Sequence, residues 1–406
     1  MKTVGIIAEY NPFHNGHLYQ IEKAKELTGA DTVVVVMSGD FAQRGTPALL
    51  SKHLRTEMAL RAGASLVFEL PVCYATGSAE LFALGAVSLL DKLGIVDSIC
   101  FGSESGNLQD LSKIADILSE EPEAYKRALQ ANLKSGISFP SARVNALSEY
   151  LEPEDSSFLL DSPNNILGIE YLKALRTLHS QMVPYTILRK ESDYHEVELN
   201  TSYSSASAIR RQIDRLDALK GQLPSHCLTI LKENYNVCYP ILQNDFSLLL
   251  KYRILKKSPG SLIKYQDVSK ELANRIKNME TDFLSFDQFC ELLKTKEITY
   301  TRINRALLHI LLGMRKSSLE AFQKDGYHYY ARLLGFRKDR ESCLTIVKKQ
   351  GTLPILTKLS ATAYLPAVAQ KMLDQDIIAS NLYESAVTER FKTSYVNEYT
   401  KQIVRV

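Results

Sequence analysis

Residues 3–27 read TVGIIAEYNPFHNGHLYQIEKAKEL and carry the strongest structural pattern in the chain. Thr3–Glu9 is short, mostly apolar and rich in β-branched residues, which is typical of a strand buried on both faces of a sheet. Between Leu18 and Leu27, apolar residues recur every three or four positions, which is the period of a helix. Tyr10–His17 contains Asn, Pro and Gly, which favour a chain reversal. The segment therefore predicts a strand that turns directly into a helix.

His14 and His17 lie three residues apart where this helix is predicted to begin. A helix N-terminus presents unpaired backbone N–H groups and the positive end of the helix dipole, so it binds phosphate readily. Two imidazoles at this place can donate hydrogen bonds to phosphate oxygens, and Gly16 between them lets a nucleotide approach the backbone. The turn also follows the first strand of a βα unit, at the sheet edge where open α/β folds bind ligands. The pattern therefore predicts a phosphate site.

Two other interpretations of the H-x-G-H tetrapeptide stay open at this point. The histidines could be polar surface residues that only cap the helix. A zinc site is the weaker alternative, because no cysteine lies nearby and the H-E-x-x-H pattern is missing. We therefore predict no metal site built by the protein itself.

The length and composition predict two domains. The chain has 406 residues, of which 45% are hydrophobic, so it can bury a sizeable core. We place the boundary near residue 220, with residues 1–220 and 221–406 as the two domains. Six cysteines without a C-x-x-C pair fit free thiols in a reducing cytoplasm. The sequence has neither a signal-peptide pattern nor a run of about eighteen apolar residues, so we expect a cytoplasmic protein with no membrane span.

The formal net charge of +3 hides a division between the two halves. Residues 1–200 hold 17 Lys and Arg against 26 Asp and Glu, a net charge of −9. Residues 201–406 hold 32 against 20, a net charge of +12. A basic half indicates a polyanion such as nucleic acid, and an acidic half with a phosphate-binding turn indicates a small nucleotide held locally.

Strands and helices are predicted to alternate through the first half of the chain. Short connections between them imply a parallel sheet with right-handed crossovers, which is an α/β, Rossmann-like fold. The G-x-G-x-x-G pattern of dinucleotide-binding folds is missing, so the histidine turn must make the phosphate site. The later strands are predicted at Asp31–Asp40, Ser65–Val72, Ser98–Glu104 and Val183–Lys190, with helices at Arg55–Ala62 and Ser78–Leu93 and a turn and helix over Asp161–Leu175.

A loop after the second strand offers further contacts to an anionic substrate. Residues 39–52 read GDFAQRGTPALLSK, and Arg44 and Lys52 in this loop can face triphosphate oxygens. The alternative is that both side chains are ordinary solvated charges. With Arg44, the residues at the start of the loop are candidates for contacts to phosphate or acetate: Ser38, Gly39 and Asp40.

A serine-rich segment, YSSASAIRR at residues 203–211, predicts a second clamp on a triphosphate. Ser204, Ser205 and Ser207 are strong N-cap residues, so the helix that follows would point N–H groups and hydroxyls at one spot, with Arg210 about one turn later. Capping alone would also explain these serines. Gly102, near the end of the fourth predicted strand, could lie flat under an adenine or ribose.

Helical patterns dominate after residue 220, and no further strands are predicted there. Basic and aromatic residues interleave in two clusters, which suits phosphate contacts combined with base stacking. A solvated helix face explains each cluster as well, and the net charge of +12 favours nucleic acid. The basic residues of the two clusters are Lys251, Arg253, Lys256 and Lys257, and Arg337, Lys338 and Arg340. The predicted helices are His226–Asn234, Phe246–Lys257, Ser269–Met279, Phe286–Thr295, Thr301–Met314 and Tyr329–Phe336.

The opening strand, turn and helix, together with SSASAIR, resemble the H-x-G-H and I-S-S-T-x-x-R motifs of the nucleotidyltransferase superfamily. A closer resemblance is to the bacterial tRNA(Met) cytidine acetate ligase family, and it runs from the N-terminus to beyond residue 310. The one departure is that Ala206 and Ser207 stand where the superfamily usually has Ser and Thr, which retains one hydroxyl. The segments that carry the closer resemblance are GIIAEYNPFHNGH, MSGDFAQRGTPAL, VFELP, FGSE, PNNILGIEY and TYTRINRALLHILLG.

This resemblance implies an HxGH nucleotidyltransferase domain with a parallel sheet, followed by a mainly helical tRNA-binding domain. It also implies a two-step reaction in which acetate and ATP form acetyl-adenylate and pyrophosphate. The acetyl group then passes to N4 of the wobble cytidine, position 34, of elongator tRNA(Met). Mg²⁺ is expected on the phosphates of the substrate ATP, and the oligomeric state is left open.

The resemblance also assigns the ATP contacts, and chemistry suggests the catalytic groups. His14 and His17 are the natural donors to the triphosphate, with Arg210 beside them, whereas the activation step needs no base because acetate is ionised at neutral pH. The expected ATP contacts are Ile7, Ala8, Glu9, Tyr10, Asn11, Pro12, Phe13, His14, Asn15, Gly16, His17, Leu18, Tyr19, Gln20, Gly102, one of Asn164 and Asn165, Arg189, Ser205 and Ser207.

Two other classes of function compete with this one. A small-metabolite adenylyltransferase of the same superfamily would share the first domain, but it needs no basic helical half. An RNA-binding protein that senses ATP through a degenerate site is a non-enzymatic alternative. The intact residues His14, Gly16, His17 and Arg210 count against the second of these.

Overall fold

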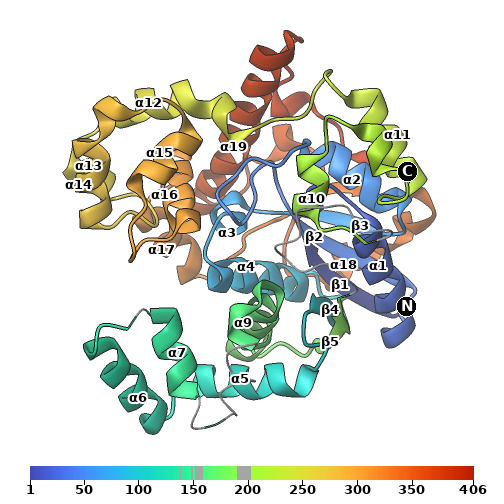
Figure 1. Ribbon diagram of the computed structural model, residues 1–406. Coiled ribbons are helices and arrows are strands. Elements are labelled where there is room, and N and C mark those ends of the chain that lie inside the picture. The colour runs from blue at the N-terminus through green and yellow to red at the C-terminus, as the bar shows by residue number, and fades with distance from the viewer. Residues whose placement is uncertain (138, 148–149, 151–158, 190–202) are drawn as a thin grey trace.

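The computed structural model describes every residue except 138, 148–149, 151–158 and 190–202. Its centre is a mixed sheet with the strand order β5-β4-β1-β2-β3-β6-β7, in which β8 also pairs with β6 (Figure 1). The first five strands run parallel to one another, as the sequence predicts. They are β1 (Thr3–Ala8), β2 (Thr32–Ser38), β3 (Leu66–Leu70), β4 (Ser98–Ser103) and β5 (Val183–Leu188).

The valine run of β2 explains how the two cores form. Val33 and Val35 belong to the core on one face of the sheet, and Val34 and Val36 belong to the core on the other face, because successive side chains of a strand point in opposite directions. The first core also contains apolar residues of α1 (Asn15–Thr28), α2 (Lys52–Arg61) and α11 (Ser225–Asn234). The second contains those of α3 (Val72–Ala75), α4 (Ala79–Lys92) and α9 (Pro163–Thr177).

The predicted helices before residue 220 form close to their expected bounds. Both α1 and α2 begin three residues early: α2 begins at Lys52 rather than Arg55, and α1 begins at Asn15 rather than Leu18, because the ring of His14 caps its first turn. After β4 the chain forms α5 (Leu108–Glu120), α6 (Glu123–Lys134) and α7 (Phe139–Leu147), and after β5 it forms the short α10 (Ala206–Arg211). The last residue of the predicted fifth strand, Lys190, lies outside the described residues.

The prediction of a helix at Tyr329–Phe336 is wrong, and so is the prediction that no strand follows residue 220. Ala331–Phe336 forms β6, which pairs antiparallel with β3. All six residues of β6 are buried, and a short apolar run of this kind has no periodicity that separates strand from helix. At this edge of the sheet, β7 (Ile355–Leu356) and β8 (Val404–Arg405) both pair with β6.

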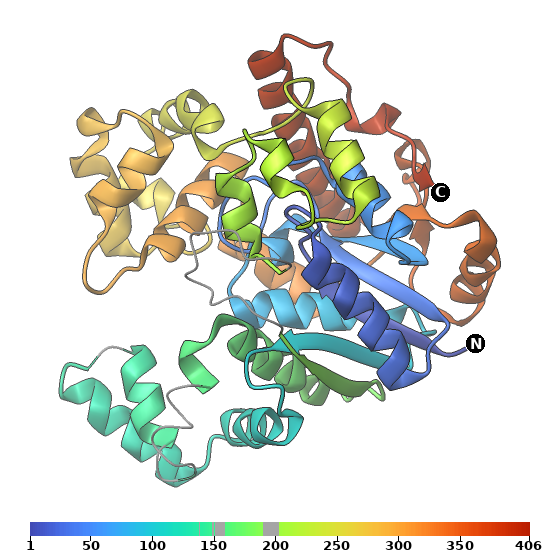
Figure 2. The ribbon, with the colours of Figure 1, turned by 45° about the vertical axis from the view of Figure 1, so that its right-hand side comes forward.

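The second half of the chain contains a helical lobe beside the sheet (Figures 1 and 2). The five helices predicted after residue 220 at 226–234, 246–257, 269–279, 286–295 and 301–314 are found within two residues at each end, and the first of them is α11. The domain boundary at residue 220 stays a prediction. Three strands of the central sheet, β6, β7 and β8, come from after this residue. The helices of the lobe are α12 (Ser247–Leu255), α13 (Pro259–Leu262), α14 (Lys270–Asn278), α15 (Phe286–Leu293), α16 (Tyr300–Leu312) and α17 (Lys316–Lys324). The chain then forms α18 (Glu341–Gln350) and α19 (Ala367–Phe391).

A buried ionic network joins the two halves. Lys52 is fully buried, and its Nζ lies 2.8 Å from carboxylate oxygens of both Glu69 and Glu398. Arg332 of β6 pairs with the same two carboxylates. The prediction that Lys52 faces a triphosphate is therefore wrong, because its charge is used to hold β3 against the C-terminal segment.

Two further expectations concern the whole chain. None of the helices in the described ranges is both long and apolar enough to cross a membrane. All six cysteines are free thiols, and five of them are buried.

Candidate active site

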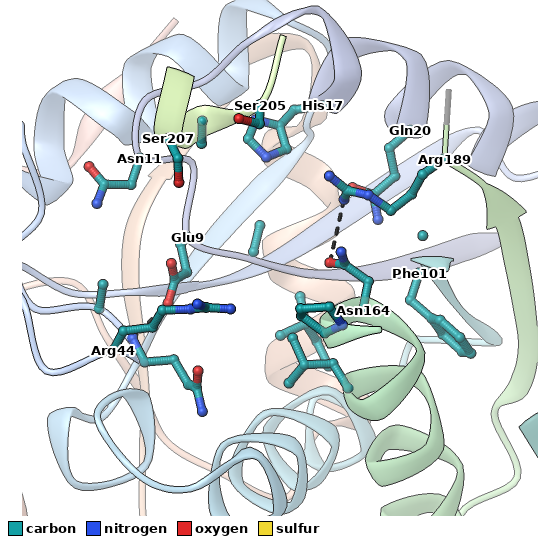
Figure 3. A pocket seen from close by; sticks show the side chains of 18 of the residues that line it. Glu9, Asn11, His17, Gln20, Arg44, Phe101, Asn164, Arg189, Ser205 and Ser207 are labelled. Carbon is teal, nitrogen blue, oxygen red and sulfur yellow. Dashed lines mark hydrogen bonds between the residues drawn. The ribbon is translucent and has the colours of Figure 1, made fainter. Parts of the chain in front are cut away.

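A cavity of about 230 Å³ lies at the carboxyl ends of β1, β4 and β5, where α1, α9 and α10 begin (Figure 3). Three helix N-termini therefore meet at one space, and the positive ends of their dipoles favour an anionic ligand. Many of the predicted site residues line it, although they come from segments up to 203 positions apart in the sequence. These are Ile7, Ala8, Glu9, Asn11, His14, His17, Gln20, Arg44, Gly102, Asn164, Arg189, Ser205, Ser207 and Arg210.

The two histidines are held as hydrogen-bond donors. Nδ1 of His14 accepts from the backbone N–H of Gly16 at 3.1 Å, and Nδ1 of His17 accepts from the N–H of His14 at 3.3 Å. The rings stack with centroids 3.7 Å apart. In a neutral imidazole the other nitrogen carries the proton, so Nε2–H of each ring is the donor that remains. The capping interpretation and the phosphate interpretation are therefore compatible, because capping fixes the donor.

Both rings are neutral in the free protein. Burial, with smaller contributions from the charges of Arg189 and Arg210, lowers the pKa of His14 to about 3. Burial, then His14 and Arg189, lower the pKa of His17 well below its usual range. The histidines therefore offer N–H dipoles, while the formal positive charge around the cavity comes from the arginines.

Three predicted residues next to the histidines, Tyr10, Phe13 and Gly16, keep the two imidazole rings in place. Tyr10 and Phe13 are buried in the core, and their ring centroids lie 4.8 and 5.4 Å from that of His17. A Cβ on Gly16 would lie 2.9 Å from Cε1 of His14, so a side chain at this position would displace the capping ring. These three residues fix the donors rather than line the main cavity.

The serine segment contributes a second group of polar atoms. Ser205 caps α10, with its Oγ accepting from the N–H of Ala208 at 3.1 Å. Arg210 donates to the backbone oxygen of Asn11 at 2.8 Å and to Oγ of Ser207 at 3.0 Å. The guanidinium is thus fixed beside the histidine turn, as the two motifs together predict.

The opposite end of the cavity is built from β4, β5 and α9. Arg189 follows β5 and donates to Oδ1 of Asn164 at 3.4 Å (Figure 3). Glu104 accepts from both the backbone N–H and Nδ2 of Asn164, which orients this amide. A Cβ on Gly102 would lie 3.2 Å from Cγ of Arg189, so glycine leaves room for the arginine to cross the strand.

Several predicted residues do not line this cavity. Of the asparagine pair, Asn164 lines it, whereas Asn165 is buried and accepts from the N–H of Ser105. Gly16 and Tyr19 line a smaller adjoining pocket of about 40 Å³, together with Ser204. The remaining predicted contacts that the cavity does not include are Tyr10, Pro12, Phe13, Asn15 and Leu18.

The cavity lining does not include Ser38, Gly39 or Asp40, whose hydrogen bonds stabilise the fold instead. The backbone oxygens of Ser38 and Gly39 accept from the buried guanidinium of Arg55. The carboxylate of Asp40 accepts from the N–H of Lys52 at 2.7 Å. Of the four predicted phosphate or acetate candidates, only Arg44 lines the cavity.

Sequence reasoning missed an apolar wall of the cavity. Phe82 comes from α4, Phe101 from β4, and Leu167 and Tyr171 from α9. No local pattern sets these apolar residues apart from core residues, although Phe101 stands in the segment FGSE, and Leu167 and Tyr171 stand in PNNILGIEY. Gln43 and Thr46 were also missed, although their position beside Arg44 in the segment MSGDFAQRGTPAL was a usable signal.

Comparisons with known proteins agree with this geometry. A sequence model described as HIGH Nucleotidyl Transferase matches residues 1–398. The tRNA(Met) cytidine acetate ligase of Acetivibrio thermocellus is 41% identical to the chain, and both chains are covered completely. The enzyme of the same name from Thermoanaerobacter sp. is 44% identical over 95% of this chain and 96% of its own.

Solved structures of Thermotoga maritima TmcAL share the whole fold. The apo form superposes with a TM-score of 0.93, and a form bound with alpha-thio ATP superposes with 0.91. Each is 33% identical to this chain and covers both chains completely. The histidine turn, the full-length sequence identity and the shared fold lead to one conclusion: the chain belongs to the HIGH nucleotidyl transferases and, within them, to the tRNA(Met) cytidine acetate ligase family.

Proposed function

We propose that this protein is an ATP-dependent tRNA(Met) cytidine acetate ligase of the cytoplasm. It activates acetate with ATP to acetyl-adenylate and pyrophosphate, and then acetylates N4 of the wobble cytidine, position 34, of elongator tRNA(Met). One observation carries the proposal: relatives named for this activity match the chain along nearly its whole length at 41% and 44% identity. The cavity supports it, because its helix N-termini, arginines and N–H donors suit a triphosphate.

Activation requires acetate to attack the α-phosphate of ATP in line with the departing pyrophosphate. Negative charge then grows on the phosphate oxygens, and fixed donors that need no rearrangement stabilise it. The Nε2–H groups of His14 and His17 fit this role, and Arg210 fits the β- and γ-phosphates beside the serine cap. The Asn164 and Arg189 end of the cavity is then available for the nucleoside.

The residues present do not fit a dedicated metal cage. Within the described part of the chain, no group of three or more His, Cys, Asp or Glu side chains is placed to hold a metal ion. Glu9 is the one carboxylate among the described residues that line the cavity. Mg²⁺ would therefore bind through the phosphate oxygens of ATP.

The basic half of the chain suits tRNA, and geometry favours one of its two clusters. Phe336 of β6 pairs with Leu66 at the beginning of β3, so Arg337–Arg340 emerge at the edge of the sheet opposite the cavity. In contrast, α12 packs on α16, and Asn304 of α16 donates to the backbone oxygen of Arg44 at 2.9 Å. Figures 1 and 2 both draw α12 and α18 on opposite sides of the molecule. We therefore propose that tRNA docks along α12.

Two matched charge removals test the docking surface. The double variant Lys256→Ala, Lys257→Ala should weaken tRNA binding and make its salt dependence shallower by about one unit of slope for each phosphate that the protein no longer neutralises. The double variant Lys338→Ala, Arg340→Ala removes the same charge and should change the Kd of tRNA by less than about twofold. Filter binding over a series of salt concentrations measures both. A larger loss of affinity in the second variant would move the docking surface to the other edge of the sheet.

The proposed activity itself is tested with labelled acetate. Label should enter tRNA only when ATP is present, and AMP should be released as a free product. Acetate-dependent ATP/pyrophosphate exchange should proceed without tRNA, because the adenylate forms first. Labelled AMP that stays attached to a small acceptor would instead favour the adenylyltransferase alternative. A panel of small carboxylates in the exchange assay identifies the acid that is activated.

A further inference from the structure

Of the described residues that line the cavity, Glu9 alone carries a carboxylate. It follows Ala8, the last residue of β1, and its side chain enters the cavity beside Arg44 (Figure 3). A negative charge repels both ATP and acetate, so Glu9 does not bind either substrate anion directly. A carboxylate in this position suits a substrate group that donates hydrogen bonds to it.

The position of Glu9 is held from two sides. Its Oε1 accepts from the backbone N–H of Gln43 at 2.6 Å, and its backbone oxygen accepts from the buried guanidinium of Arg55 at 2.7 Å. Among the described residues, no donor binds Oε2. One carboxylate oxygen is therefore anchored, and the other is available to a ligand in the cavity.

The cavity that Glu9 enters has an apolar wall that suits a planar base. Phe82, Leu167 and Tyr171 contribute to this wall, and Phe101 extends it at the end where Asn164 and Arg189 lie (Figure 3). The pKa of the Tyr171 phenol is raised first by burial and then by the negative charge of the Glu9 carboxylate. The exocyclic N4 amine of cytosine carries only donors, and Glu or Asp is the usual protein acceptor for it.

Acetyl transfer also needs a proton acceptor. When N4 of cytosine attacks the acetyl carbonyl carbon, the nitrogen gains positive charge and its protons become acidic, so a carboxylate is a sufficient base. The histidines do not supply one, since Nδ1 of each ring is occupied and Nε2 carries the proton. The arginines stay protonated, and the amides and hydroxyls that line the cavity are far weaker bases.

We propose that Glu9 is the general base of acetyl transfer, an inference that rests on the proposed function. Its free oxygen accepts a hydrogen bond from N4 of cytidine and takes the proton as the N–C bond forms. The bond between the acetyl carbon and the phosphate oxygen breaks, and its electron pair leaves with AMP. The proton on Glu9 then passes to solvent, which restores the carboxylate.

The variant Glu9→Gln tests this role. The amide oxygen of glutamine can still accept from the N–H of Gln43, but the amide cannot take a proton at neutral pH. Single-turnover transfer from preformed enzyme-bound acetyl-adenylate to tRNA, followed by rapid quench, should fall on the order of 10²-fold further than acetate-dependent ATP/pyrophosphate exchange falls. Glu9→Asp, which retains a base, should recover part of the transfer rate.

Glu104→Gln is the matched control, because Glu104 is a carboxylate at the other end of the cavity that orients Asn164. This variant should lower exchange and transfer by similar factors. Equal losses of both steps in Glu9→Gln would mean that Glu9 only positions the loop at Gln43, and an unchanged transfer rate would also overturn the proposal. Failure of the unmodified protein to acetylate tRNA at all would refute the proposed function instead.

Discussion

Replacing His14 or His17 by alanine is expected to slow acetate-dependent ATP/pyrophosphate exchange by roughly 10²–10³-fold, the usual effect of losing one preorganised donor to developing charge. Each ring has its Nδ1 occupied by a backbone N–H, so its Nε2–H is aimed before the substrate binds. The stacked arrangement makes the two donors a unit, and the double variant should lose less than the product of the single effects.

The loss of a phosphate donor has to be separated from the loss of a helix cap. His14 caps α1, and removing a cap costs about 1 kcal/mol of stability. His14→Asn retains an oxygen that can accept from the N–H of Gly16 but lacks the Nε2 donor, so it should keep the thermal stability and lose the exchange rate. His179→Ala, at an exposed site after α9, is the control and should change exchange by less than twofold. Near-normal exchange in both alanine variants would remove the histidines from the mechanism.

Replacing Lys52 by methionine is expected to lower the free energy of unfolding by about 3–5 kcal/mol, because it leaves two buried carboxylates, Glu69 and Glu398, with Arg332 as their one remaining cation in the described part of the chain. Lys52 lies between Glu69 and Glu398 and also donates to Oγ of Ser380 at 2.7 Å. Methionine has a similar volume, so the loss should come from the uncompensated charge rather than from a cavity. The C-terminal segment around Glu398 should become sensitive to proteases first.

Urea unfolding followed by circular dichroism, together with limited proteolysis, measures this effect. Lys23→Met is the matched control, since the ion pair of Lys23 with Glu26 is exposed and such pairs contribute little. It should change stability by less than about 1 kcal/mol. If the two variants unfold at the same urea concentration, the buried network does not hold the C-terminal segment to the sheet.

Local sequence patterns were sufficient for the opening βα unit. The strand at Thr3–Glu9, the turn and the helix could be read directly, because a buried strand, a cap and a helical period each involve residues close together in the chain. The histidine turn and the serine cap were found for the same reason. That they meet in one cavity followed from the parallel sheet, whose strands end at a common edge.

The tertiary structure decided the features that depend on distant partners. Tyr329–Phe336 looked helical because Ala331–Phe336 becomes a strand through its pairing with β3, β7 and β8, and β3 lies some 260 residues earlier in the chain. Arg44 and Lys52 come from one predicted loop, yet Arg44 lines the cavity and Lys52 begins α2 and is buried, since the carboxylates of Glu69 and Glu398 surround the lysine.

The sequence by itself thus determined the βα framework, the histidine and serine motifs predicted to bind phosphate, and the division of charge. Only the tertiary structure decided that Asn164 rather than Asn165 lines the cavity, that apolar residues of α4 and α9 form its wall, and that Arg337–Arg340 lie at the far edge of the sheet. The physical reason is that capping, turns and periodicity act between neighbours in the chain. Burial and charge pairing depend on which distant segments the fold brings together.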